Sequence, residues 1–173
     1  MSNIVKASPG PGMDLRVFDE SGAFKPEFVA FQRRYFERET PFNGLMGLTL
    51  DAFEPTGVTS RLPMRPDLVG HRPTHRVHGG AISATLDVTG GFAIMAAMAV
   101  RHPLETLAQL VARFSKISTI DLHVNYLNVG IGNHFLIHAT VLRLGSRVAT
   151  TRMEFMNADG KLLASGSGAY MVA

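Results

Sequence analysis

The residues best suited to chemistry lie at one end of a long apolar segment. His78-Gly79-Gly80 is followed by a run from Ala81 to Val100 in which Asp87 is the only ionisable side chain. Burial of an unpaired charge costs several kcal/mol or shifts its pKa instead. We therefore interpret Asp87 as a catalytic acid on a buried helix, with a purely structural aspartate as the alternative.

The apolar run invites comparison with a membrane span, since about 20 residues cross a bilayer. Asp87 and the Gly90-Gly91 pair interrupt it, however, and the chain contains no second run of this kind. A helix that is apolar on all sides is typical of the interior of a globular domain. We therefore expect a buried central helix and no membrane contact.

The composition indicates a single globular domain. The chain has 173 residues, of which 46% are hydrophobic, and this length supports a substantial core. It has no cysteine, which rules out disulfides and thiolate sites and fits a reducing compartment. The segment from Met1 to Gly12 contains prolines and glycines but no apolar leader core, so we expect a loose tail and a cytoplasmic protein.

The charge is mildly basic, with a net value of +3. Four arginines concentrate it ahead of the His-Gly-Gly: Arg61, Arg65, Arg72 and Arg76. Such a cluster could bind the phosphates of nucleic acid or of a cofactor, or it could be a solvated surface. No helix-turn-helix spacing, zinc finger or aromatic-basic pattern accompanies it. We therefore expect no nucleic-acid partner.

Hydrophobic periodicity predicts two short helices and a series of strands around the central helix. One helix is expected between Pro26 and Pro41, and a second carries an apolar stripe formed by Leu104, Leu107, Ala108, Val111 and Phe114. Alternation predicts a hairpin over residues 48–64 and strands over 119–127, 134–143, 147–157 and 161–171. The predicted class is α+β, with an antiparallel sheet of five or six strands wrapped around one long helix. We expect residues 1–40 to form a tail and a short amphipathic helix, and residues 41–173 to form one domain.

Several segments, in this order, resemble the hotdog-fold acyl-CoA thioesterases, the group typified by phenylacetate-pathway enzymes and their medium- and long-chain relatives. They are Val77-His78-Gly79-Gly80, Asp87, Thr119–Leu127, Gly145–Ala149 and the final strand from Gly160 to Tyr170. The resemblance extends from about Pro41 to the C-terminus. It implies a hotdog fold with an extra N-terminal helix, and hydrolysis of an apolar acyl-CoA, either medium/long-chain or aromatic. It also implies no separate cofactor, because coenzyme A is part of the substrate.

The chemistry of thioester hydrolysis fits these residues. Free N–H groups at a helix N-terminus offer donors and a favourable dipole to a carbonyl oxygen that becomes an oxyanion. The resemblance implies that the Gly79 N–H is this donor and that Gly80 lies beside the substrate. The alternative is that the two glycines only permit a tight turn. Asp87 is then the general base or the nucleophile, and the sequence leaves both roles open.

One chain is not expected to complete this site. Asp87 lies eight residues beyond Gly79, and a helical rise of 1.5 Å per residue separates them by ~12 Å. The resemblance implies that the Asp87 of one subunit faces the His-Gly-Gly of another. We therefore expect a homodimer whose interface forms the active site, or a dimer of such dimers.

Two supporting residues depend on the same resemblance. Thr119 stands where similar enzymes carry a hydroxyl that orients the attacking water, although strict alternation would turn it away from the helix. Only a bend at the start of the strand would bring it to the site, and Ser115 and Ser118 compete with it. Arg72 stands where some relatives carry an asparagine that places the carbonyl or the water, and we expect Arg72 to donate in its stead.

Histidine offers one further alternative. His71, His75 and His78 are close enough in sequence to suggest a zinc site, but Pro73 disfavours one helix and no carboxylate or cysteine completes the set. We expect no metal. His78 is expected instead to shape the helix start and contact the substrate.

The acyl chain and the coenzyme A phosphates have weaker candidates. Gly90 and Gly91 either open space for an acyl chain or pack closely against a strand, and the helix of residues 104–114 could line that space. Arg147 is a candidate for a phosphate contact. Two other functions stay open: a noncatalytic acyl-CoA-binding hotdog module, and a hotdog dehydratase or hydratase. The latter enzymes use a histidine, which the run from Ala81 to Val100 lacks.

Overall fold

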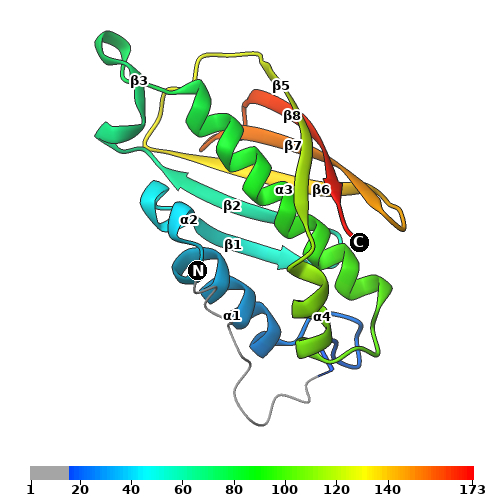
Figure 1. Ribbon diagram of the computed structural model, residues 1–173. Coiled ribbons are helices and arrows are strands. Elements are labelled where there is room, and N and C mark those ends of the chain that lie inside the picture. The colour runs from blue at the N-terminus through cyan, green and yellow to red at the C-terminus, as the bar shows by residue number, and fades with distance from the viewer. Residues whose placement is uncertain (1–15) are drawn as a thin grey trace, which may run out of the picture.

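A computed structural model describes residues 16–173, and the predicted tail from Met1 to Gly12 lies outside them. A six-stranded sheet forms the body of the protein, with strand order β1-β2-β6-β7-β8-β5 and antiparallel neighbours throughout (Figure 1). Its strands are β1 (Thr49–Glu54), β2 (Gly57–Pro63), β5 (Ser118–Tyr126), β6 (His134–Leu144), β7 (Val148–Asn157) and β8 (Leu162–Met171). These bounds confirm the predicted hairpin and the four later strands to within a residue or two.

The central helix is α3 (Gly79–Arg101), which crosses one face of the sheet (Figure 1). Its length and composition would allow it to cross a membrane, but 67% of its apolar window is buried within the protein. Leu86 and Ile94 are completely buried in the core that α3 shares with the sheet. The positions of α3 that stay partly exposed, among them Ser83, Asp87 and Gly91, follow helical spacing along one side, and burial of the remaining sides explains why the helix has so few polar residues. The predicted α+β arrangement is confirmed.

A short hairpin leads into α3. It consists of β3 (Val69–His71) and β4 (Arg76–Val77), with one-turn helices η2 (Pro66–Leu68) and η3 (Arg72–Thr74) beside them. The hairpin is tied to the start of α3 by a hydrogen bond from the His78 N–H to the Leu68 carbonyl, 2.8 Å long. The chain therefore enters α3 from a fixed direction.

The N-terminal helices lie along the edge strand β1 (Figure 1). They are α1 (Pro26–Arg34), a π-helical turn η1 (Tyr35–Glu39) and α2 (Pro41–Met46). The predicted helical segment between Pro26 and Pro41 is present, but its α-helix ends at Arg34 and continues as the π-helical turn to Glu39, and Pro41 is the first residue of a further helix, α2. Phe36 packs edge-on against Phe92 of α3, at 4.7 Å between ring centroids, so these helices contribute to the same core.

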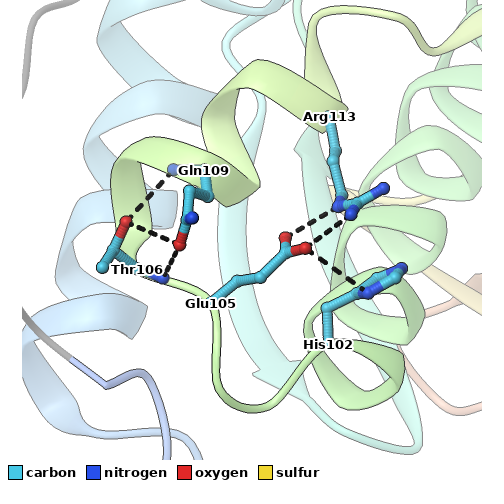
Figure 2. A network of polar contacts seen from close by, with 5 residues as sticks. All are labelled: His102, Glu105, Thr106, Gln109 and Arg113. Carbon is cyan, nitrogen blue, oxygen red and sulfur yellow. Dashed lines mark hydrogen bonds and ion pairs between the residues drawn. The ribbon is translucent and has the colours of Figure 1, made fainter.

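The second amphipathic helix is α4 (Leu107–Phe114), and it begins later than predicted. Thr106 and Gln109 form a capping box that fixes the start (Figure 2), and the signature T-x-x-Q is present in the sequence. Leu104 therefore lies outside the helix and is 78% exposed, which corrects its place in the predicted stripe. Glu105 binds Arg113 and lies 3.5 Å from His102, and the hydrogen bond from Arg113 holds the pKa of Glu105 below its usual value (Figure 2).

Candidate active site

His78 caps the N-terminus of α3. Its Nδ1 accepts a hydrogen bond of 2.8 Å from the Gly80 N–H, so this nitrogen is unprotonated and the ring proton of the neutral imidazole is on Nε2. A Cβ at position 80 would lie only 2.9 Å from Nδ1, which explains why glycine follows the capping residue so closely. The expectation that His78 shapes the helix start is thus matched by a specific contact.

The first N–H of α3, that of Gly79, is free to bind a ligand. Among residues 16–173 it has no hydrogen-bond acceptor, because the residue four positions earlier, whose carbonyl would accept it, lies before the helix begins. Gly79 lines a surface pocket of about 450 Å³ together with Ile82, Tyr126 and Val129, among others. A free donor at the positive end of a 23-residue helix therefore lies beside a surface pocket.

Tyr126, which the sequence analysis did not single out, lies against this helix start. Its hydroxyl donates to the Gly79 carbonyl at 3.0 Å. Its ring is so near that a Cβ at position 79 would lie 3.3 Å from the ring carbon Cε1. Regular alternation along β5 could have revealed Tyr126, because it places Tyr126 on the same face of the strand as Leu122 and Val124, which pack against the core.

Asp87 and Thr119 meet in the middle of α3. The Thr119 hydroxyl donates to Asp87 Oδ1 at 2.8 Å, and Asp87 is half-buried. No ion pair to this carboxylate forms within the described part of the chain. The aspartate thus has one neutral hydrogen-bond donor and no compensating cation, which leaves it available to accept a proton.

A bulge in β5 makes this contact possible. Thr119 pairs with Tyr170 and Asp121 with Ala169, so Ile120 is an extra residue without a partner. An extra residue reverses the alternation of side chains on one side of it. Ile120 was expected to face the helix but is 53% exposed, and Thr119 faces α3 instead. This is the bend that the sequence analysis required for Thr119.

Tyr170 anchors the same turn of α3 from β8. Its buried hydroxyl donates to the Asp87 carbonyl at 3.2 Å. Burial, followed by the negative charge of Asp87, raises the pKa of the Tyr170 hydroxyl, which is therefore neutral near pH 7.

The two central glycines differ in their surroundings. A Cβ at Gly90 would lie 2.5 Å from the Tyr170 hydroxyl oxygen and 2.7 Å from the Met153 sulfur. Close packing against the sheet, the alternative to an acyl-chain role, therefore accounts for Gly90. A Cβ at Gly91 would have no neighbour within 4 Å, so of the two glycines only Gly91 has open space beside it.

The two predicted arginines lie away from the Gly79 pocket. Arg72 is exposed in η3 and lines a separate hollow of about 940 Å³ with Arg65 and His75. Arg147 is exposed in the β6–β7 turn, next to Val148. Val148 and Ser118 both pair with Met171, so Arg147 lies at the same end of the sheet as Ser118, the first residue of β5. In residues 16–173 no group of three His, Cys, Asp or Glu side chains is arranged to hold a metal ion.

The structure thus groups the candidates into two half-sites on one helix. The donor half-site contains His78, Gly79, Gly80 and Tyr126, and the acid half-site contains Asp87 and Thr119. Because α3 is continuous between Gly79 and Asp87, the helical rise keeps the two residues ~12 Å apart. A reacting carbonyl cannot contact both half-sites of the same chain.

A sheet wrapped around a central helix, with a free donor at the helix start and an aspartate eight residues later, defines a hotdog protein of the thioester-hydrolase class. The sequence profile of the thioesterase superfamily matches residues 75–164, which include both half-sites. The chain belongs to the thioesterase superfamily and is a thioester hydrolase.

Individual relatives agree with this family. The medium/long-chain acyl-CoA thioesterase YigI of Salmonella typhimurium is 36% identical over 137 residues, covering 79% of this chain and 88% of that protein. YigI of Escherichia coli K12 is 34% identical over the same coverage. A crystal structure of a Shewanella oneidensis protein related to the thioesterase superfamily has a TM-score of 0.80 at 34% identity, covering 85% of this chain and 96% of that one. The predicted hotdog fold is confirmed.

Proposed function

We propose that this protein hydrolyses acyl-CoA thioesters at a site made by two subunits. The observation that carries the proposal is the combination, within residues 16–173, of a Gly79 N–H without a hydrogen-bond acceptor and an Asp87 side chain that accepts from Thr119. The YigI relatives, which cover 79% of this chain, are acyl-CoA thioesterases, and this supports coenzyme A as the leaving thiol.

In the proposed reaction the thioester carbonyl oxygen accepts a hydrogen bond from the Gly79 N–H. Asp87 takes a proton from a water molecule, and the oxygen of that water bonds to the carbonyl carbon to give a tetrahedral oxyanion. The oxyanion collapses, the carbon–sulfur bond breaks, and the coenzyme A thiolate leaves and takes up a proton. Thr119 holds Asp87 Oδ1, which directs the other carboxylate oxygen toward the water.

Direct attack by Asp87 is the competing route, and ¹⁸O found in the protein after a single turnover would identify it. In a single turnover in ¹⁸O-labelled water, general-base catalysis places the label in the released acid. A nucleophilic Asp87 forms an anhydride with the acyl group. Hydrolysis of that anhydride at the Asp87 carbonyl would place the label in the protein, where mass spectrometry of the peptide detects it.

The two edges of the sheet support the homodimer. At edge strand β1, the Leu50 N–H donates to Glu37 and the Leu50 carbonyl accepts from Arg33, so the N-terminal helices occupy this edge. Edge strand β5 has β8 on one side and no covering element from the described chain on the other. Several large apolar side chains on and beyond it are more than half exposed: Ile120, Tyr126, Leu127, Val129 and Ile131. An open edge flanked by exposed apolar side chains fits pairing with a second copy of the strand.

An apolar acyl group suits the surroundings of the acid half-site. Open space beside Gly91 lies one helical turn beyond Asp87, on a helix with no other ionisable side chain before Arg101. We propose that the acyl chain occupies this space and that its length is medium or greater. The YigI relatives are medium/long-chain acyl-CoA thioesterases, which supports the same chain length.

Release of free thiol from a panel of acyl-CoAs tests the proposal. The purified protein is expected to hydrolyse medium- and long-chain substrates, and Asp87→Asn is expected to abolish turnover while leaving a folded dimer. Asp159→Asn, the same change in the exposed β7–β8 turn, serves as the matched control. Full activity of Asp87→Asn would contradict the mechanism, and binding of acyl-CoA without turnover by the wild type would favour a noncatalytic binding module.

A further inference from the structure

The first two residues of α3 are glycines, which makes the start of the helix easy to deform. Gly79 and Gly80 carry no side chains, and glycine loses more conformational freedom on ordering than any other residue. The first N–H groups of a helix also lack the backbone bonds that hold later turns. A catalytic donor is effective only when it is aimed accurately at the position where the charge develops. At this turn the His78 carbonyl, which shares a peptide unit with the Gly79 N–H, accepts from the Ala81 and Ile82 N–H groups at 3.0 and 3.2 Å, and contacts on the next peptide can hold the turn more firmly.

Two side chains hold the peptide unit between Gly79 and Gly80 at both of its polar ends. The carbonyl accepts the Tyr126 hydroxyl at 3.0 Å, and the N–H donates to His78 Nδ1 at 2.8 Å. The Tyr126 ring also packs against the Gly79 backbone. Rotation of this peptide would break one or both of these hydrogen bonds, so the Tyr126 and His78 side chains reinforce the direction that the bonds to the His78 carbonyl give the preceding Gly79 N–H.

We propose that Tyr126 is a positioning residue that aims the Gly79 N–H at the thioester carbonyl. This inference rests on the proposed acyl-CoA hydrolysis. Tyr126 belongs to β5, the strand at the open edge of the sheet, and it also lines the pocket of about 450 Å³ that Gly79 faces. Ordering of β5 by a second subunit therefore orders the oxyanion donor of the site that this interface creates.

Tyr170 supplies a comparison within the same protein. Its hydroxyl makes the same kind of bond to the same helix, at the Asp87 carbonyl. Removing either hydroxyl by a change to phenylalanine deletes one hydrogen bond to α3 and keeps the ring. Of the two tyrosine bonds, only that of Tyr126 lies at the peptide next to the Gly79 N–H. A general increase in the mobility of α3 would therefore affect both variants, whereas a changed direction of the Gly79 N–H would affect Tyr126→Phe alone.

The test combines kinetics with vibrational spectroscopy. In Tyr126→Phe, kcat is expected to fall about fivefold or more, as loss of one hydrogen bond of ordinary strength predicts, with KM nearly unchanged. In the Asp87→Asn background, an acyl-CoA labelled with ¹³C at the thioester carbonyl binds without turnover. There the infrared carbonyl band is expected to move to higher frequency in Tyr126→Phe, because a poorly aimed donor polarises the bond less. Tyr170→Phe is expected to leave this band in place.

Two results would overturn the inference. One is a Tyr126→Phe protein with the kcat and the carbonyl band of its parent. The other is an equal shift of the band in both tyrosine variants, which would indicate general loosening of α3. Failure of the proposed function is recognised separately, because the wild-type protein would then release no thiol from any acyl-CoA.

Discussion

Replacing Gly79 by proline removes the proposed oxyanion donor with little disturbance of the helix start. Proline lacks a backbone N–H, and it is favoured at the first helical position because that N–H has no intrahelical partner. The preceding His78 has φ −69° and ψ 137°, which lies in the extended region that a residue before proline requires. The variant therefore deletes one donor and keeps the backbone path.

The size of the effect follows from the role assigned to this N–H. Loss of one oxyanion donor typically costs about 3 kcal/mol of transition-state stabilisation, or roughly a 100- to 1000-fold fall in kcat. The added Cβ contributes a second, smaller effect, because it would lie 3.3 Å from Tyr126 Cε1. Gly79→Ala introduces the same Cβ and keeps the N–H, so the difference between the two variants isolates the donor.

The assay is thiol release from the best substrate of the panel, followed with a chromogenic disulfide. Thermal unfolding and gel filtration check that each variant is folded and keeps the assembly state of the wild type. We expect Gly79→Ala to keep most of the activity and Gly79→Pro to lose nearly all of it through kcat. A folded Gly79→Pro protein with the kcat of Gly79→Ala would refute the assignment of the donor.

Three further changes probe the surroundings of the site. Thr119→Val removes the hydroxyl that binds Asp87, and kcat should fall about tenfold because hydrogen bonds to charged groups are worth roughly 1.5–3 kcal/mol. Thr119→Ser should restore most of the lost kcat. Equal kcat values for Thr119→Val and the wild type would argue against a role of the Thr119 hydroxyl in catalysis. Gly90→Ala should lower the free energy of unfolding by about 1–3 kcal/mol, because the new Cβ overlaps Tyr170 and Met153. Gly91→Ala should raise it by up to about 1 kcal/mol through helix propensity, because nothing lies within 4 Å; denaturant unfolding distinguishes the pair, and equal effects would mean that packing does not explain Gly90. Burial raises the pKa of Tyr170 above its unfolded value near 10, so the contribution of Tyr170 to stability should be constant below that pH and fall above it by up to about 1.4 kcal/mol per pH unit. Tyr170→Phe should flatten this alkaline loss, and an unchanged slope in urea unfolding would show that another group causes it.

The sequence was sufficient for the elements whose residues repeat regularly. The strands from β5 to β8 alternate plainly, and the apolar run of α3 is bounded by His78 at its start, so both were predicted closely. The change from α-helix to a π-helical turn at Tyr35 and the late start of α4 depend on local interactions. For α4 the choice was visible in the capping residues Thr106 and Gln109.

The site was predictable only where its chemistry is local to the sequence. Gly79 and Asp87 stand out by residue type, but Thr119 reaches Asp87 because Ile120 bulges, and a bulge leaves no regular signal in one strand. Tyr126 and Tyr170 bind backbone carbonyls of α3 from strands far away in the chain. Such contacts arise from the register of the sheet against the helix, which no short motif records.

A complementation experiment with mixed dimers tests the two-subunit site most directly. One chain carries Asp87→Asn and the other carries Gly79→Pro, and each is inactive alone. In a dimer of one chain of each kind, the intact Gly79 of the first faces the intact Asp87 of the second, so one of the two sites is complete. Random mixing should therefore recover about a quarter of the wild-type activity. Recovery of no activity from mixed dimers, whose formation is verified by mass spectrometry, would contradict a site shared between subunits.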